Sequence, residues 1–146
     1  MEEIPFNPLP PEWEGHPMPP SVPAGMQLRL SRAKVVPGQE QEAEAWMDML
    51  NRRYDEAVAT LPRERAAFES MFLSREPDGS TWLYHLELFG DSGGGLDPET
   101  SDVDREHIEY GRRVKLRGWE ELEPKFMLAP DHIREAFERW CADGTA

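Results

Sequence analysis

Three polar residues at helical spacing form one candidate group for chemistry in this sequence. Asp104, His107 and Tyr110 are three residues apart, so in a helix their side chains lie along one face. A carboxylate beside an imidazole can orient it, and a phenol beside the ring can donate or accept a hydrogen bond. We therefore expect these residues to be candidates for acid–base catalysis. Helix capping and a buried, hydrogen-bonded histidine are the structural alternative.

A second candidate group lies in two segments in which residues alternate between two faces. In residues 80–89 the alternation places His85 and Glu87 on a mixed polar and apolar face, opposite a face of aromatic residues and leucines. In residues 65–75 it places Glu69 on the same mixed face. Because the apolar face should meet the helices, we expect the mixed face to point away from them. A histidine near a carboxylate stays basic near neutral pH and can transfer protons. A hydrogen-bonded structural cluster and plain solvent exposure are the alternatives, and Arg29 and Ser31 are candidates for the same face.

The other chemical signals are weaker. The 4 histidines show no metal-ligand spacing, so we predict neither a metal nor a cofactor. The Gly-Asp-Ser-Gly run at 90–93 has no base beside it to activate the serine, and no Lys-Ser or Lys-Thr pair follows to make a phosphate loop. The single Cys141 cannot form an internal disulfide, which fits a reducing cytoplasm.

Hydrophobic periodicity predicts the elements that must position these residues. Alternation predicts strands at 27–36, 65–75, 80–89 and 122–128, the middle two joined as a hairpin. Helical spacing predicts helices at 39–61, at 102–117 and from Pro130 to Gly144, with Pro62 ending the first. This order gives an α+β fold of the ferredoxin-like βαββαβ type, with a four-stranded antiparallel sheet, both helices on one face and an added C-terminal helix. The glycine-rich run 90–102 is predicted to be a mobile loop that could act as a lid.

The N-terminal segment has a different composition. Eight of the 14 prolines fall within residues 1–25, where they forbid helices and central strands, so we divide the chain into an arm, 1–25, and a domain, 26–146. The arm is expected to be extended or disordered. The alternative is that it packs Phe6 and Trp13 across its own domain or a neighbouring subunit.

Charge narrows the range of partners. The 146 residues include 29 acidic and 16 basic side chains, a formal charge of −13. Such a chain repels nucleic acid and anionic membranes, and no apolar run is long enough to span a bilayer, so we expect no nucleic acid and no membrane. An anionic substrate is disfavoured too, unless Arg29 or Arg32 opens a local positive pocket. The acids and prolines at the N-terminus are unlike a signal peptide, which also favours the cytoplasm.

A pattern of spaced residues between 28 and 128 carries a resemblance. It consists of Pro37-Gly38, Glu40, Trp46, Leu50-Asn51, Glu56, Thr60-Leu61, Glu64, Glu69-Ser70, Phe72, Leu73, Asp104, His107 and Tyr110. The pattern resembles a small, uncharacterised bacterial family of the dimeric α+β barrel type, which implies a homodimer and a fold but no reaction. The wider superfamily that it resembles contains cofactor-independent monooxygenases, polyketide cyclases, lactone isomerases and haem-degrading enzymes, which use the pocket between sheet and helices.

Two functional hypotheses from different classes follow. The first is a small cytoplasmic enzyme of the cofactor-independent monooxygenase, cyclase or isomerase type, acting on an uncharged or cationic apolar metabolite in biosynthesis. His107 or His85 would transfer the proton, assisted by Glu69, Asp104 or Tyr110. The second is a non-catalytic homodimeric binding or interaction module. A partly apolar cavity lined by both histidines would favour the enzyme, and a filled barrel would exclude it.

Overall fold

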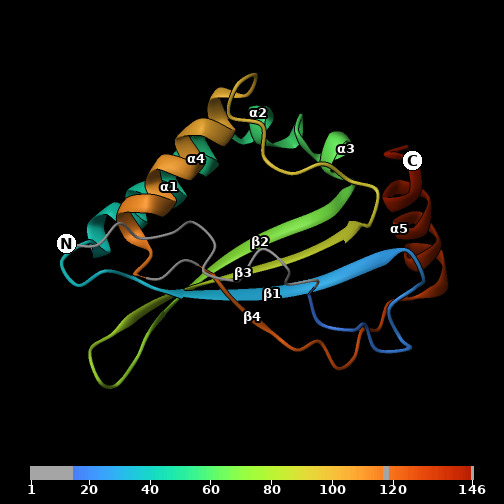
Figure 1. Ribbon diagram of the computed structural model, residues 1–146, viewed down its shortest axis with the longest axis horizontal. Coiled ribbons are helices and arrows are strands. Elements are labelled where there is room, and N and C mark those ends of the chain that lie inside the picture. The colour runs from blue at the N-terminus through green and yellow to red at the C-terminus, as the bar shows by residue number, and fades with distance from the viewer. Residues whose placement is uncertain (1–14, 117–118, 146) are drawn as a thin grey trace.

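The computed structural model describes residues 15–116 and 119–145, which form one sheet with helices packed on it (Figure 1). The strands are β1 (Met26–Lys34), β2 (Ala66–Arg75), β3 (Thr81–Gly90) and β4 (Glu120–Leu122). The helices are α1 (Glu40–Arg52), α2 (Tyr54–Val58), α3 (Leu61–Glu64), α4 (Asp102–Val114) and α5 (Asp131–Asp143). All strand pairs are antiparallel and the strand order is β2-β3-β1-β4, which is compatible with the predicted ferredoxin-like plan.

The main core lies between the sheet and the pair α1 and α4. Leu83 of β3, Trp46 and Met49 of α1, and Val103 and Val114 of α4 are buried together in it. Because Leu83 faces these helices, the rest of the mixed face of β3 also points toward them. The prediction that the mixed face points away from the helices is therefore wrong. Both faces of β3 carry large apolar side chains, and alternation alone could not decide which one the helices cover.

The single helix predicted over 39–61 is wrong, because this segment forms α1, α2 and α3. Arg53 leaves the helical conformation (φ −101°, ψ 33°) after α1, and the Asn51 side chain donates to the Met47 carbonyl oxygen at 2.9 Å. Pro62 lies in the first turn of α3, where its missing N–H costs no hydrogen bond, so it helps to begin a helix rather than to end one. Apolar spacing continues through the three helices, and periodicity could not reveal the breaks.

The last strand is shorter than predicted. β4 ends at Leu122 instead of spanning 122–128, and Pro124 follows, which has no N–H to donate to a sheet. The Met127 N–H donates instead to Ser21 Oγ at 2.9 Å. The predicted C-terminal helix is confirmed as α5, which is capped by Gly144 in the left-handed region (φ 73°).

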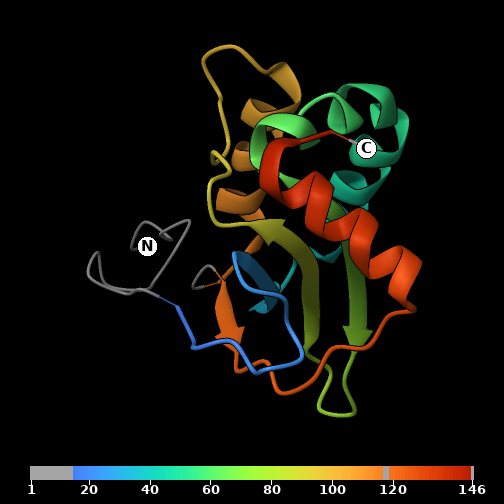
Figure 2. The same cartoon turned by 90° about the vertical axis from the view of Figure 1, so that its right-hand side faces the viewer.

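A second core cluster lies on the other face of the sheet, beneath α5. Val22, Met26, Leu88 and Cys141 are buried in it, and Met18 packs against them. Residues 15–25 of the predicted arm therefore contact the domain, whereas Phe6 and Trp13 lie outside the described residues. Figure 2 shows α5 crossing one end of the sheet. Among the described residues, no helix is both long enough and apolar enough to cross a bilayer.

The contact between β3 and α5 yields a stability prediction. A Cβ atom on Gly90 would lie 1.9 Å from the carbonyl oxygen of Cys141, whereas one on Gly95 would meet nothing within 4 Å. We expect Gly90→Ala to lower the free energy of unfolding by about 1–3 kcal/mol, because α5 must shift to admit the methyl group. Urea denaturation would measure this change, with Gly95→Ala as the control. Equal stability of the two variants would show that α5 does not pack here.

Candidate functional site

A cavity of about 360 Å³ lies between the sheet and the helices α1 to α4, and it is open to solvent. The sheet forms its floor, and the glycine-rich residues Gly93 to Leu96 form part of its wall. Four of the five predicted site residues line it: Glu69 from β2, His85 from β3, and Asp104 and His107 from α4. Tyr110 is not among the lining residues. Its ring stacks parallel to that of Trp46, and the Arg113 guanidinium lies over the Tyr110 ring, 4.5 Å from the ring centre.

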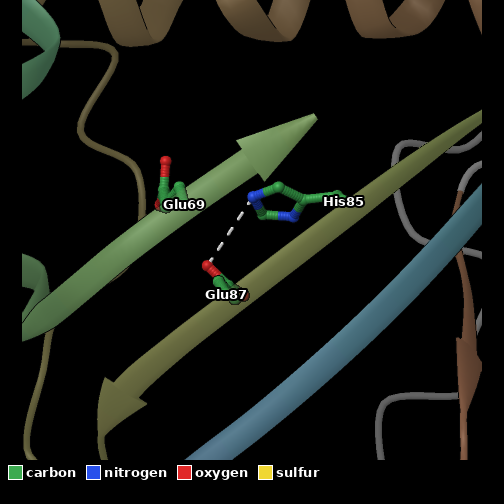
Figure 3. Close-up of side chains that lie close together, drawn as sticks. All are labelled: Glu69, His85 and Glu87. Carbon is green, nitrogen blue, oxygen red and sulfur yellow. Dashed lines mark ion pairs between the residues drawn. The ribbon is translucent and has the colours of Figure 1, made fainter. Parts of the chain in front are cut away.

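The floor of the cavity carries charged side chains from three adjacent strands. Glu69 pairs in register with Glu87, and Glu87 pairs with Arg29. Figure 3 shows Glu69, His85 and Glu87 on neighbouring strands, with His85 Nε2 3.9 Å from Glu87 Oε2. The Arg29 Nε–H donates to Glu87 Oε1 at 2.7 Å. The predicted shared face of Glu69 and His85 is thus present, and it is covered by helices.

Glu69 is the carboxyl group most changed by this environment. Desolvation by the surrounding protein is the main cause that raises the pKa of Glu69 to about 8, and the nearby carboxylates of Glu64 and Glu87 add to it. Its side chain nevertheless remains accessible to water, because the cavity is open. Glu69 therefore carries a proton at neutral pH and can exchange it with water or with a ligand.

Both histidines of the cavity are neutral. Burial is the main cause that lowers the pKa of His85, with Arg29 and Lys115 adding to it and Glu87 opposing it. Burial, followed by the charges of His85 and Lys115, lowers the pKa of His107 to about 3. Burial also lowers the pKa of Lys115 to about 7. A neutral imidazole can accept a proton on its unprotonated nitrogen, so His85 beside Glu69 is a base beside an acid.

His107 and Asp104 have other partners than the sequence predicts. The Trp46 indole N–H donates to His107 Nδ1 at 2.9 Å. Asp104 Oδ2 accepts from Arg63 at 2.8 Å and from the backbone N–H of Asp97 at 2.8 Å. Asp104 thus anchors the chain around it, and a tryptophan orients the histidine.

Arg63 is a structural residue of the site that sequence reasoning missed. Besides binding Asp104, it donates to the Gly95 carbonyl oxygen at 3.3 Å, and its own carbonyl accepts from the Gly94 N–H at 2.9 Å. A Cβ atom on Gly93 would lie 1.9 Å from the Glu64 carbonyl oxygen, so only glycine permits this approach. The loop predicted to be mobile is therefore held against α3.

Within residues 15–116 and 119–145, Glu69, His85 and Glu87 form a group with the residue types and spacing to hold a metal ion. Each offers one ligand atom, and these atoms lie within 4.8 Å of one another. Carboxylate oxygens and imidazole nitrogens bind divalent metals, but the Arg29 guanidinium already holds the Glu87 carboxylate. We assign no metal to the group. Histidine spacing could not have indicated this cluster, because strand pairing creates it.

The raised pKa of Glu69 predicts a pH dependence of stability. The folded chain binds this proton more tightly than the unfolded chain, so stability falls as the pH rises from about 4.5 to about 8. At pH 8.5 we expect Glu69→Gln to raise the free energy of unfolding by about 1 kcal/mol, less than for a fully buried carboxylate because water reaches the group. Denaturation at pH 5 and pH 8.5 would measure the effect, with Glu109→Gln on the exposed face of α4 as the control. A similar change in the free energy of unfolding in both variants would contradict the raised pKa of Glu69.

Comparisons with known proteins bear on the family of the chain and not on its reaction. Searches of curated proteins and of solved structures found no match. A sequence model described as Family of unknown function (DUF6176) matches residues 26–135, which include the sheet and every helix that covers the cavity. The match confirms one part of the resemblance predicted over 28–128, namely that the family is uncharacterised. The chain belongs to the family of unknown function DUF6176.

Proposed function

We propose that this protein is a cytoplasmic bacterial enzyme that uses general acid–base catalysis, without a cofactor, on a small apolar metabolite. One observation carries the proposal: the carboxyl group of Glu69, whose pKa is raised to about 8, and the imidazole of His85, whose pKa is lowered, share the floor of an accessible cavity. Environments that push the pKa values of neighbouring groups in opposite directions are typical of acid–base pairs in enzymes.

The proposed reaction is the movement of a proton within the ligand. His85 removes a proton from an activated carbon, and the electron pair of that C–H bond forms a double bond. The carboxyl group of Glu69 gives its proton to the atom on which negative charge would otherwise accumulate. Return of the proton from His85 to the ligand, and of a proton to Glu69, completes an isomerisation. The same first step can begin a cyclisation or a cofactor-independent oxygenation.

The walls of the cavity support a neutral or cationic ligand with apolar surface. Leu50, Met71, Phe89 and Val103 supply apolar contacts. The carboxyl groups that line the cavity belong to Glu64, Glu69, Glu87, Asp104 and Glu121. The lining arginine, Arg29, is already paired with Glu87, so an anionic ligand would meet net repulsion.

Exchange of hydrogen for deuterium tests this proposal without knowledge of the natural substrate. We expect the protein in D₂O to accelerate exchange at activated carbons of some members of a panel of small ketones, lactones and phenols, followed by NMR. His85→Gln or Glu69→Gln should lower the rate at least about 100-fold, since each removes one proton carrier. The wild-type rate should also fall as the pH rises through about 8, where Glu69 loses its proton.

The control for this assay is His132→Gln, at the exposed start of α5 and away from the cavity. It should leave the exchange rate unchanged. Exchange that persists in both cavity variants would contradict the proposed roles of His85 and Glu69.

A homodimer is a second proposal, and it rests on the sheet face opposite the cavity. Phe72 of β2 is 56% exposed there, in register with Tyr84 of β3, and Leu122 of β4 is 36% exposed in the next row of the same face. A large aromatic side chain this exposed on a sheet face is typical of a protein interface. We propose that two copies pair through this face. The alternative function, a non-catalytic homodimeric interaction module, requires the same pairing.

A substitution on that face tests the dimer. We expect the wild-type chain to sediment as a dimer at micromolar concentration and Phe72→Glu to sediment as a monomer, because two buried carboxylates would face each other at the interface. Tyr54→Glu is a matched control, since Tyr54 is 64% exposed on α2, away from this face. A wild-type monomer of 16.8 kDa would refute the paired sheets.

A further inference from the structure

The contact between Trp46 and His107 determines which nitrogen of the histidine carries the proton. The indole N–H of Trp46 can only donate a hydrogen bond, and it lies 2.9 Å from His107 Nδ1. Nδ1 must therefore present its lone pair. Because a neutral imidazole holds one proton, that proton is on Nε2.

The packing around Trp46 makes this arrangement rigid. Trp46 is fully buried in the main core, where its ring centre lies 6.5 Å from that of Tyr110 and 6.3 Å from that of Trp119. Its ring centre is 5.1 Å from that of His107. Rotation of the indole would disrupt these contacts, so the core itself holds the donor against Nδ1.

The other nitrogen of His107 is available to a ligand. Within the described part of the chain, no hydrogen bond involves His107 Nε2, although the residue lines the cavity. The groups that act on this ring electrostatically are His85 of β3, which is neutral, and Lys115, which follows α4. Nε2 is not among the buried side-chain atoms that lack a partner, so an Nε2–H on this cavity-lining residue is accessible, and a ligand oxygen can accept its hydrogen bond.

We propose that the ligand is a carbonyl compound whose oxygen accepts a hydrogen bond from His107 Nε2–H, and that Trp46 is the positioning residue that fixes this donor. The inference rests on the proposed acid–base function and specifies its substrate class. When His85 takes the proton from the carbon beside the carbonyl, the C–H electron pair forms a C=C bond and the C=O pair moves to oxygen. That oxygen takes the proton of Glu69, and His107 keeps its own proton throughout.

A neutral donor suits this role better than a charged one. His107 stabilises negative charge on the oxygen while the charge develops, and it does not compete with Glu69 to deliver the proton. Because the donor is fixed before the ligand binds, no reorganisation is needed during the reaction. This explains why the core uses a tryptophan, a donor that cannot accept, beneath a histidine of the cavity.

Nitrogen NMR of the histidine side chains tests the donor directly. We expect His107 in the wild-type protein to show a protonated Nε2 and an unprotonated Nδ1 from pH 5 to pH 8, and Trp46→Phe to show a mixture of tautomers. A proton on Nδ1 in the wild-type protein would overturn the inference. Since this measurement needs no ligand, its result is independent of the proposed function.

A second pair of variants keeps the test valid if Trp46→Phe does not fold. His107→Gln retains an N–H donor of similar length, and His107→Met retains the volume without a donor. In the exchange assay with ketones and lactones, we expect His107→Met to be at least about tenfold slower than His107→Gln. Equal rates in these two variants would overturn the donor role.

The assay also separates the two proposals. Exchange confined to the phenols of the panel would overturn the carbonyl substrate and leave the acid–base function standing. Exchange of no compound would overturn the proposed function, and the histidine spectra would then still decide whether His107 is a fixed donor.

Discussion

Carboxylates crowded on the covered face of the sheet are the constraint on which the rest of the site depends. Glu64, Glu69 and Glu87 meet in one cavity. The guanidinium of Arg29 is hydrogen-bonded to Glu87, whereas the carboxylates of Glu64 and Glu87 act on Glu69. A proton on Glu69 relieves that repulsion. The same desolvation that makes ionisation costly for Glu69 keeps His85 and His107 neutral. One physical cause thus yields an acid and a base side by side.

The architecture maintains this arrangement. Antiparallel pairing places Arg29, Glu87 and Glu69 in register across three strands, so a rigid sheet, and not a loop, sets their spacing. The helices above the sheet supply Trp46 and His107, and Arg63 ties α3 to the glycine-rich loop and to Asp104. The site therefore lies where floor, helices and loop meet. Membership of DUF6176 brings no reaction with it, so function must be argued from these contacts.

Local patterns were enough to predict the order of the elements and one shared face. Alternation on β2 and β3 placed Glu69 and His85 together, because side chains two residues apart in a strand point the same way. Alternation could not tell which face the helices cover, since both are rich in apolar residues. Nor could it place Trp46 on His107, 61 residues away, or Arg63 on Asp104, 41 residues away. Such contacts depend on how helices pack, which one sequence does not reveal.

Carbon NMR of the glutamate side chains across pH would measure the protonation state of Glu69 most directly. The structure predicts that one glutamate carboxyl group, assigned to Glu69 by its loss in Glu69→Gln, titrates near pH 8. It also predicts that His85 and His107 are neutral at the pH at which Glu69 titrates. A Glu69 that titrates near pH 4.5, as in an unfolded chain, would show that the cavity does not hold an acid beside a base.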